Sequence, residues 1–235
     1  MFYKLSNTCD VNEIEDELNF TFKYPNLYEP LTIINGLNEN SVPVITSENP
    51  KDINFAIWGL LPEAYDDDWD TFQDVTNTLN TNIDDQYLNT EIYSTSLDKR
   101  RCLIVVNGFF TSKLLEGKLV PFHVHLKNHR PFCLAGVYNT ISDGFLTCSI
   151  LVKKSGREFD DIPNLGDKQP MVLKKKDHND WLNRNSKLSD LEPMIQQNVT
   201  CGFLSHAIDY EFYDNLKIYK KIVNSDYYQS NMKIT

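Results

Sequence analysis

Three histidines form the densest group of potential metal ligands in the sequence. His123 and His125 stand two positions apart in the alternating stretch 120–127, and His129 follows shortly afterwards. Residues two apart on a β-strand share one face, so the first two imidazoles are predicted to point the same way. Imidazole is a common ligand of zinc and copper, but no neighbouring Cys or carboxylate pattern completes such a site. We therefore predict the polar face of a sheet here and no metal ion.

An acidic run is the second group with possible binding chemistry. Asp66, Asp67 and Asp68 are followed by Asp70 and Asp74. Carboxylate oxygens suit hard cations, but the alternating Asp/Asn positions and central Gly of an EF-hand loop are missing. We predict a solvated acidic loop, whose charge would repel nucleic-acid phosphates.

Four other residues have either a chemical or a structural interpretation. Thr111 and Ser112 are potential nucleophiles, although no His or Lys nearby in the sequence offers itself as their base. Trp58 is either a base-stacking residue or a core residue. Arg101, at the start of an apolar run, is either a phosphate ligand or a strand-end charge in a surface salt bridge. The sequence leaves these alternatives open.

Composition limits the range of functions. The chain has 235 residues and a net charge of −10, which argues against general nucleic-acid binding. Lysines and arginines gather within 99–127 and 153–187, so a local basic face remains compatible with the sequence. The sequence shows neither a signal peptide nor a segment apolar enough for a membrane helix. We therefore expect a cytoplasmic protein without a membrane partner.

The cysteines are predicted to be structural. Five cysteines lie far apart and form no C-x-x-C motif, which argues against a disulfide framework or a zinc ribbon. Cys102, Cys133 and Cys148 stand inside apolar runs, where a thiol behaves as a small hydrophobic group. We expect these three side chains to be buried.

Most of the elements that would position these groups are strands. Apolar or alternating runs predict an antiparallel meander of four strands, at 101–110, 120–127, 132–138 and 145–152. Shorter strands are predicted at 42–45, 54–61, 171–173 and 216–223. Helices are predicted at 11–20, with Asp10 as N-cap, and at 177–191.

Four strings in a fixed order carry a resemblance to a known family. They are Trp58 to Pro62, Arg101 to Ile104, Asn107 to Phe110, and Phe132 to Tyr138. Looser matches occur at Asn80, Gln169 to Leu173, and Trp181 to Leu182. Each string alone has low specificity. Their common order and spacing are much more specific. Over residues 55–185 the chain resembles the SOS-response-associated peptidase (SRAP) family, the abasic-site processing proteins.

The resemblance implies chemistry at a terminal cysteine. Family members begin Met-Cys-Gly-Arg, and loss of the Met exposes a Cys with a free amine. That amine and its thiol close a thiazolidine ring with the aldehyde of an abasic site in single-stranded DNA. A Glu, an Asn and a His assist proton transfer, and arginines hold the phosphates. No cofactor is implied.

This sequence departs from the family at most of the chemical positions. Position 2 is Phe2, so the thiol is missing, and a bulky second residue is expected to block removal of Met1. The family's Glu aligns with Thr111 and its His with Pro163, and neither is an acid or base near neutral pH. Only Asn80 is retained.

The charged positions are better preserved. Lys4 and Lys168 keep the charge of family arginines, whereas Asn82 and Asp84 replace an Arg and a Glu. The predicted DNA-binding set is Lys4, Trp58, Arg101 and Lys168.

These observations predict an α+β fold: one SRAP-like domain over residues 1–235, with mixed, mostly antiparallel sheets in a barrel-like core flanked by helices. The predicted function is that of a degenerate relative of abasic-site sensors in the SOS response to DNA damage. This pseudoenzyme would lack the crosslinking and peptidase chemistry and keep its cleft for single-stranded DNA or another partner. Two alternatives are an active DNA–protein crosslinking peptidase or lyase with displaced residues, and an interaction protein that does not bind DNA. The oligomeric state is left open.

Overall fold

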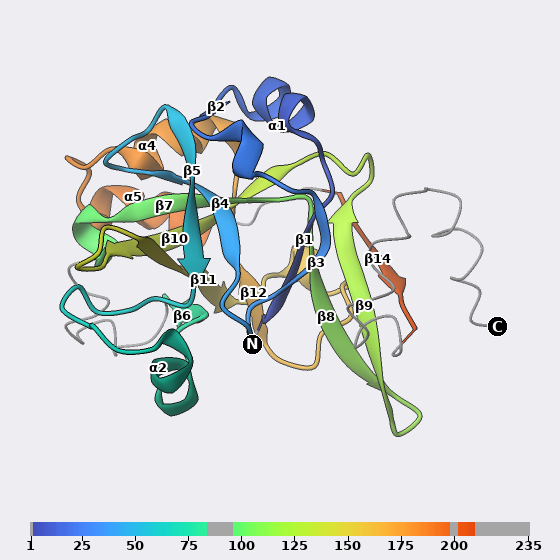
Figure 1. Cartoon of the computed structure of the whole chain (residues 1–235). Helices are drawn as coiled ribbons and strands as arrows, with labels where there is room; N and C mark the ends of the chain where they lie inside the picture. Colours follow the sequence, from blue (N-terminus) through green and yellow to red (C-terminus); the bar gives the residue numbers. More distant parts are fainter. Residues whose placement is uncertain (1, 84–95, 198–201, 210–235) are drawn as a thin grey trace.

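The computed structural model of the chain describes residues 2–83, 96–197 and 202–209. Two β-sheets flanked by helices make up these ranges (Figure 1), so the predicted α+β class is confirmed. Within the described ranges, no helix is long and apolar enough to cross a membrane. The strand predicted at 216–223 lies outside the described residues.

The larger sheet has nine strands, five of which form a closed ring. These five are β4 (Ser41–Thr46), β5 (Asp52–Trp58), β7 (Arg101–Val106), β10 (Phe132–Thr140) and β11 (Leu146–Lys154). A parallel pairing between β11 and β5, at Cys148 and Trp58, closes the ring and gives the core its barrel-like form. The remaining strands of this sheet are β2 (Thr21–Phe22), β6 (Asn80–Asn82), β12 (Lys168–Pro170) and β13 (Val172–Leu173).

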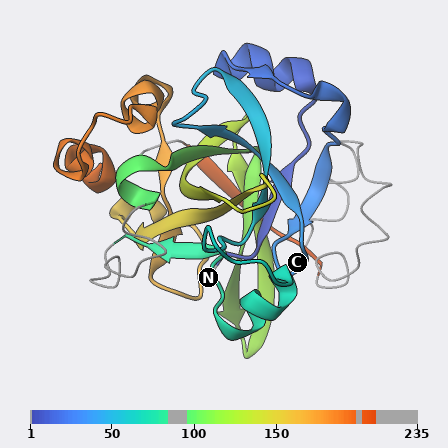
Figure 2. The same ribbon diagram turned by 60° about the vertical axis from the view of Figure 1, so that its left-hand side comes forward.

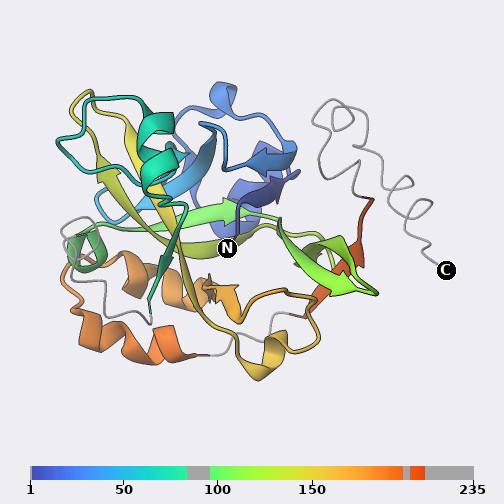
Figure 3. The ribbon, with the colours of Figure 1, turned by 90° about the horizontal axis from the view of Figure 1, so that it is seen from below.

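The smaller sheet has five strands in the order β14-β9-β8-β1-β3. Their bounds are β1 (Lys4–Asn7), β3 (Leu31–Asn35), β8 (Gly108–Leu115), β9 (Lys118–Leu126) and β14 (Phe203–Ala207). All pairings in this sheet are antiparallel. Seen from below, β14 and the β8–β9 hairpin lie on the opposite side of the molecule from α4 (His178–Leu182) and α5 (Leu188–Gln196) (Figure 3).

The predicted four-strand meander is wrong because the chain changes sheet at Asn107. β7 ends just before this residue, and β8 begins just after it in the other sheet. The Ser6 hydroxyl donates to Asn107 Oδ1 (3.1 Å), and Asn107 Nδ2 donates to Thr8 Oγ1 (2.6 Å). As a result, β9 pairs with β8 and β14, whereas β10 pairs with β7 and β11. An apolar pattern predicts a strand but does not specify its partners.

The helices lie outside the sheets (Figure 2). α1 (Val11–Leu18) begins as predicted: Asp10 accepts from the Glu13 backbone N–H, and the Glu13 carboxylate accepts from that of Asp10. α2 (Trp69–Val75) follows the acidic loop. The single helix predicted over 177–191 is wrong, because the chain breaks between α4 and α5. In that break, the backbone carbonyls of Asn183 and Ser186 accept hydrogen bonds from Arg101. Short 3₁₀ helices lie at Pro25–Leu27, Arg157–Phe159 and Lys175–Asp177.

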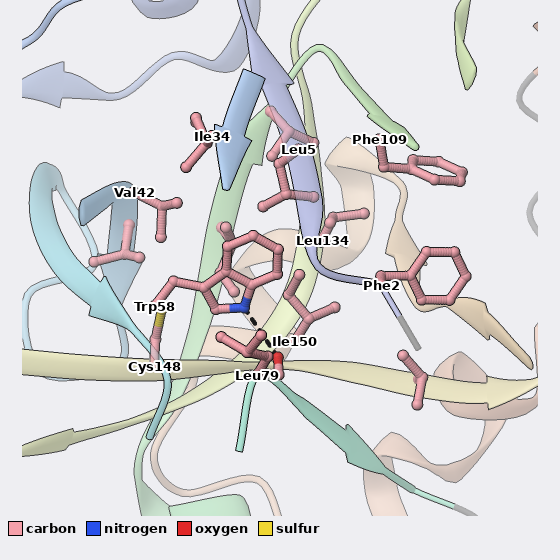
Figure 4. Close-up of a cluster of buried hydrophobic side chains, with 14 of the residues drawn as sticks. Phe2, Leu5, Ile34, Val42, Trp58, Leu79, Phe109, Leu134, Cys148 and Ile150 are labelled. Carbon is pink, nitrogen blue, oxygen red and sulfur yellow. Dashed lines mark hydrogen bonds between the residues drawn. The ribbon is translucent and has the colours of Figure 1, made fainter. Parts of the chain in front are cut away.

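Two large hydrophobic clusters form most of the core, and β7 contributes to both. Ile104 faces a cluster that joins the two sheets and includes Trp58 (Figure 4). Leu103 faces a second cluster that includes Ile14 of α1 and Trp181 of α4. A strand buried on both faces reads as a continuous apolar run, which is what the sequence shows at 102–106. Cysteines 102, 133 and 148 are buried free thiols, as predicted.

Candidate functional site

Asn80 lies against the backbone of residue 2. It is the first residue of β6, where it pairs in register with Ile150 of β11. The Phe2 backbone N–H donates to Asn80 Oδ1 (3.2 Å), and Asn80 Nδ2 donates to the Phe2 carbonyl (2.6 Å). One side-chain amide therefore satisfies both backbone polar groups of residue 2 and fixes its position. The structure brings these two sequence-predicted positions together.

The side chain of Phe2 is part of the core. It is 2% exposed, and its ring meets that of Phe109 edge to face, with centroids 5.7 Å apart (Figure 4). Phe109 also contacts Phe159 (6.1 Å) and Phe203 (5.8 Å), and Phe203 contacts Phe132 (5.4 Å). We call these five residues the phenylalanine cluster. Such ring pairs are stabilising beyond their buried area, so the residue 2 side chain packs and offers no reactive group.

Thr111 follows Phe109 by two residues on β8 and so shares its face. The side chain is 6% exposed, and its hydroxyl oxygen has no hydrogen-bond partner among the described residues. No His or Lys in that part of the chain therefore activates this hydroxyl, and the nucleophile interpretation lacks support. The position that resembles the family's Glu holds a neutral, buried group with unused hydrogen-bonding capacity.

Pro163 lies in irregular chain beside the phenylalanine cluster. Its neighbour Ile162 is buried in the same hydrophobic cluster as Phe2 and Phe159. Pro163 itself is half-buried and carries no titratable group. The segment resembling the family's His region thus contributes apolar packing to the same core cluster as Phe2.

The two predicted DNA-binding lysines lie on different sheets. Lys4 of β1 is 7% exposed, and its ammonium lies 5.9 Å from the centre of the Tyr3 ring. Lys168 of β12 is half-buried and directly opposite Lys154 of β11 in the strand register. Sequence reasoning missed Lys154, because only strand pairing places it next to Lys168. The contact of these lysines with DNA stays a prediction.

Trp58 belongs to the core, so its predicted role as a base-stacking residue is wrong. It has no exposed surface, and its indole N–H donates to the Leu79 carbonyl at 3.0 Å (Figure 4). A Cβ at Gly36 would lie 2.7 Å from the indole ring, which shows how closely the backbone approaches. A base has no access to this ring.

Arg101 is also buried, so neither a phosphate contact nor a surface salt bridge describes it. Its guanidinium has no exposed surface and donates to five backbone carbonyls. The acceptors are those of Trp181 (2.7 Å), Leu97 (2.9 Å), Asp98 (2.7 Å), Asn183 (2.5 Å) and Ser186 (3.3 Å). Burial lowers the pKa of Arg101, and the charge of Asp98 opposes that change. The neighbouring Arg100 instead makes the surface salt bridge, to Glu63.

His123 and His125 are not on a polar, solvated face, which corrects the sequence-based prediction. They are 3% and 2% exposed. The single hydroxyl hydrogen of Ser6 is donated to Asn107, so the Ser6 oxygen accepts a hydrogen bond from His123 Nε2–H (2.9 Å). His125 Nδ1–H donates to the Leu126 carbonyl (2.7 Å). Burial lowers the pKa of His125 to about 4 and that of His123 well below its usual value. Both imidazoles are neutral at pH 7.

The histidines stack face to face instead of converging on a point. The rings of His125 and His129 are 4.0 Å apart and within 10° of parallel, and His206 lies 5.1 Å from His125. Throughout the described ranges, no group of three or more His, Cys, Asp or Glu side chains is arranged to hold a metal ion.

The described cysteines are unreactive. Burial raises the pKa of the Cys9 thiol to about 12 and that of Cys102 well above its usual value. Cys133 and Cys148 are shifted in the same direction, again mainly by burial. The thiolate is the nucleophilic form, so none of these four thiols is prepared to attack an aldehyde. The region around residue 2 can therefore bind by shape and hydrogen bonds, but the described residues supply it with no activated nucleophile.

Comparison with known proteins identifies relatives. A family model described as SOS response associated peptidase (SRAP) matches residues 2–210, well beyond the strings found in the sequence. The abasic site processing protein YMR114C of Saccharomyces cerevisiae is 26% identical over 124 residues, which are 52% of this chain. The chain spans only 32% of that relative's length.

Solved structures share the fold. A protein from Bacteroides thetaiotaomicron matches with a TM-score of 0.78 and 19% identity, over 90% of this chain and 94% of its own. A protein from Bordetella bronchiseptica matches with a TM-score of 0.71 and 14% identity, over 88% of this chain and 99% of its own. A phage-related protein from the same organism has a TM-score of 0.65 and 11% identity, over 88% of this chain and 93% of its own. At these identities the likeness concerns the fold alone.

Proposed function

Because the chain belongs to the SOS response associated peptidase (SRAP) family, we propose that it binds abasic single-stranded DNA without forming a covalent bond to it. The observation that carries this proposal is the state of residue 2. Asn80 holds the Phe2 backbone, while the Phe2 side chain fills the phenylalanine cluster. Residue 2 is held in place by Asn80, and a packed phenyl ring stands where the family resemblance implies a reactive thiol.

The DNA component of the proposal comes from the abasic site processing relative in yeast. An abasic site presents an aldehyde, and a thiazolidine needs an amine and a thiol on the same residue. Position 2 supplies no thiol, and Cys9, Cys102, Cys133 and Cys148 are all buried. Thr111, in place of a Glu, supplies neither acid nor base. Binding without bond formation is the chemistry that these groups support.

The proposed binding face includes Lys168 and Lys154, which are adjacent across β11 and β12. Lysine ammonium groups bind phosphate oxygens through charge-assisted hydrogen bonds, so two of them at adjacent strand positions would favour a phosphate here. Because the whole chain carries a net charge of −10, this attraction is local and should weaken steeply with salt.

The test uses single-stranded DNA with one abasic site and the same strand without it. We expect wild-type protein to bind at low salt, to prefer the abasic strand, and to leave no adduct on a denaturing gel. Intact-mass measurement of the same sample establishes which residue begins the chain. A denaturation-resistant adduct formed by wild-type protein would overturn the loss of covalent chemistry. Failure to bind either strand at low salt would favour a partner other than DNA.

A gain-of-function experiment tests the same idea from the other side. The Phe2→Cys/Thr111→Glu double variant restores two of the three missing groups, the cysteine and the glutamate, and keeps Asn80. We expect it to form an adduct with the abasic strand once its chain begins at residue 2. The matched control is Phe2→Ser/Thr111→Glu, which has nearly the same size and no thiol. An adduct with the control variant would show that the thiol is not what this chain lacks.

A further inference from the structure

The edge strand β14 is held on the five-stranded sheet through both of its faces. Its backbone pairs with β9 from Phe203 opposite Leu126 to Ala207 opposite Phe122. On one face, Phe203 enters the phenylalanine cluster. On the other face, His206 stacks on an imidazole of β9. Residues three apart on a strand point to opposite faces, so one short strand connects two separate groups of side chains.

His206 is the last member of a continuous stack of four imidazoles, which we call the imidazole stack. His123 lies 5.1 Å from His125, and His125 lies 4.0 Å from His129 and 5.1 Å from His206. Two of the rings come from β9, one from the turn after it and one from β14. The two β9 rings are almost fully buried. A proton added to any ring therefore lies within about one ring spacing of another imidazole.

The uncharged neighbours of the stack come from β8 and β1. Phe110 of β8 stacks on His123 at 4.8 Å, and Ser6 of β1 is hydrogen-bonded to the same imidazole. A Cβ at Gly108 would lie 2.3 Å from His123 Nε2, so the backbone of β8 packs directly against the ring. These groups do not titrate in the range in which imidazole does.

The titratable groups next to the stack include a neutral thiol and two cations. Cys9 donates from its thiol to the His129 carbonyl, and its raised pKa keeps it neutral. Lys127 and Arg130, exposed on either side of His129, are cations. The exposed carboxylate of Asp209 lies three residues beyond His206 along the chain. Burial, and after it the charges of the other imidazoles, lower the pKa values of His123, His125 and His129.

We propose that the imidazole stack is an acid-labile clasp, which holds β14 on β9 while its rings are neutral and releases β14 when they are protonated. Release is local, because β14 is an edge strand and β9 is its only partner among the described strands. It withdraws Phe203 from the phenylalanine cluster and uncovers Phe109, the ring on which Phe2 packs. The clasp therefore controls access to the region around residue 2, whatever that region binds.

The direction of the pH effect follows from linkage. In the closed state His125 has a pKa of about 4, whereas an imidazole freed into water has its usual value of 6.5. The open state therefore binds more protons between these two values, and acid favours opening. Each titrating imidazole multiplies the opening equilibrium constant by up to about tenfold for each pH unit lost in this range.

Amide hydrogen exchange of the full chain, followed from pH 7.5 to 5 and corrected for intrinsic exchange rates, measures the opening. We expect protection of residues 203–207 to fall about tenfold or more between pH 6.5 and 5.5, while β7 and β10 stay protected. The His206→Phe variant keeps a ring in the stack but removes the imidazole whose charge helps to lower the pKa of His125 and His129, so the slope of β14 protection with pH should be shallower. His206→Gln, which removes the ring from this half-buried edge position, should already show weaker β14 protection at pH 7.5.

His178→Asn is the matched control. That imidazole packs against Phe20 on the other side of the larger sheet and has a similarly lowered pKa, so its loss should leave the β14 slope unchanged. The proposal is overturned if β14 and β7 lose protection together, because that would be global unfolding. It is also overturned if His206→Phe shows the wild-type slope.

Discussion

Replacing Arg101 by Met should lower the free energy of unfolding, because Arg101 supports the fold and does not contact DNA. The guanidinium is fully buried and donates to five backbone carbonyls, two from the segment before β7 and three from α4 and the break that follows it. A hydrogen bond from a charged donor contributes about 1.5–3 kcal/mol. The substitution also relieves the desolvation of a buried charge, and the two carbonyls beyond α4 can regain water. We therefore expect a loss of about 4 kcal/mol in the free energy of unfolding, within the range for a broken buried polar network.

The neighbouring residue supplies the control. Arg100 makes a single salt bridge to Glu63, whose side chain is 58% exposed, so Arg100→Met should cost less than about 1 kcal/mol. Urea unfolding followed by far-ultraviolet circular dichroism gives both free energies. Binding of the abasic strand is measured in parallel, below the onset of unfolding. If Arg101→Met left stability within about 1 kcal/mol of wild type and abolished DNA binding, Arg101 would be a phosphate ligand and the assignment to the scaffold would be refuted.

Three further substitutions test individual features. Asn80→Ala removes both hydrogen bonds to the Phe2 backbone and should cost about 2 kcal/mol in urea unfolding, and Asn80→Asp, which can only accept, should be no better. The His178 pKa is lowered from 6.5 to about 4, so the stability contributed by the neutral imidazole is complete above pH 6.5 and is lost as pH falls towards 4. His178→Asn should therefore reduce the decrease in unfolding free energy between pH 6.5 and 4 by about 3 kcal/mol. Gly108→Ala places a methyl group 2.3 Å from His123 Nε2, and a drop in melting temperature of several degrees is expected; an unchanged melting temperature would mean that β8 and β9 can separate at low cost.

Several features near the site were predictable from local sequence. The N-cap at Asp10, the buried thiols and the apolar run of β7 depend on neighbouring residues or on simple alternation, and each was correctly predicted. The strings around Trp58 and Phe132 carried the family resemblance, and the family match over residues 2–210 agrees with it. These features could be predicted because the interactions that produce them lie within one strand or one helical turn.

Errors occurred where a side chain depends on distant partners. His125 looks like the polar position of an alternating strand, yet a second strand and a turn bury it in a stack of rings. Arg101 looks like a strand-end charge, but three of its acceptors come from α4 and the break that follows it, up to 85 residues away. The helix predicted over 177–191 is interrupted because those carbonyls turn towards the guanidinium. In each case a tertiary contact outweighed a preference worth only a fraction of a kcal/mol per residue.

The sequence alone determined that this chain has the strands of its family and that Phe2 and Thr111 replace the family's Cys and Glu, because residue identity at a position needs no coordinates. Only the tertiary structure decided what those replacements do. It placed Asn80 on the backbone of residue 2 and the Phe2 ring among four other phenylalanines. The physical reason is that the contacts of Phe2 with Asn80 and Phe109 join residues about 80 and 110 positions apart, and such contacts arise only when both sheets close around one core.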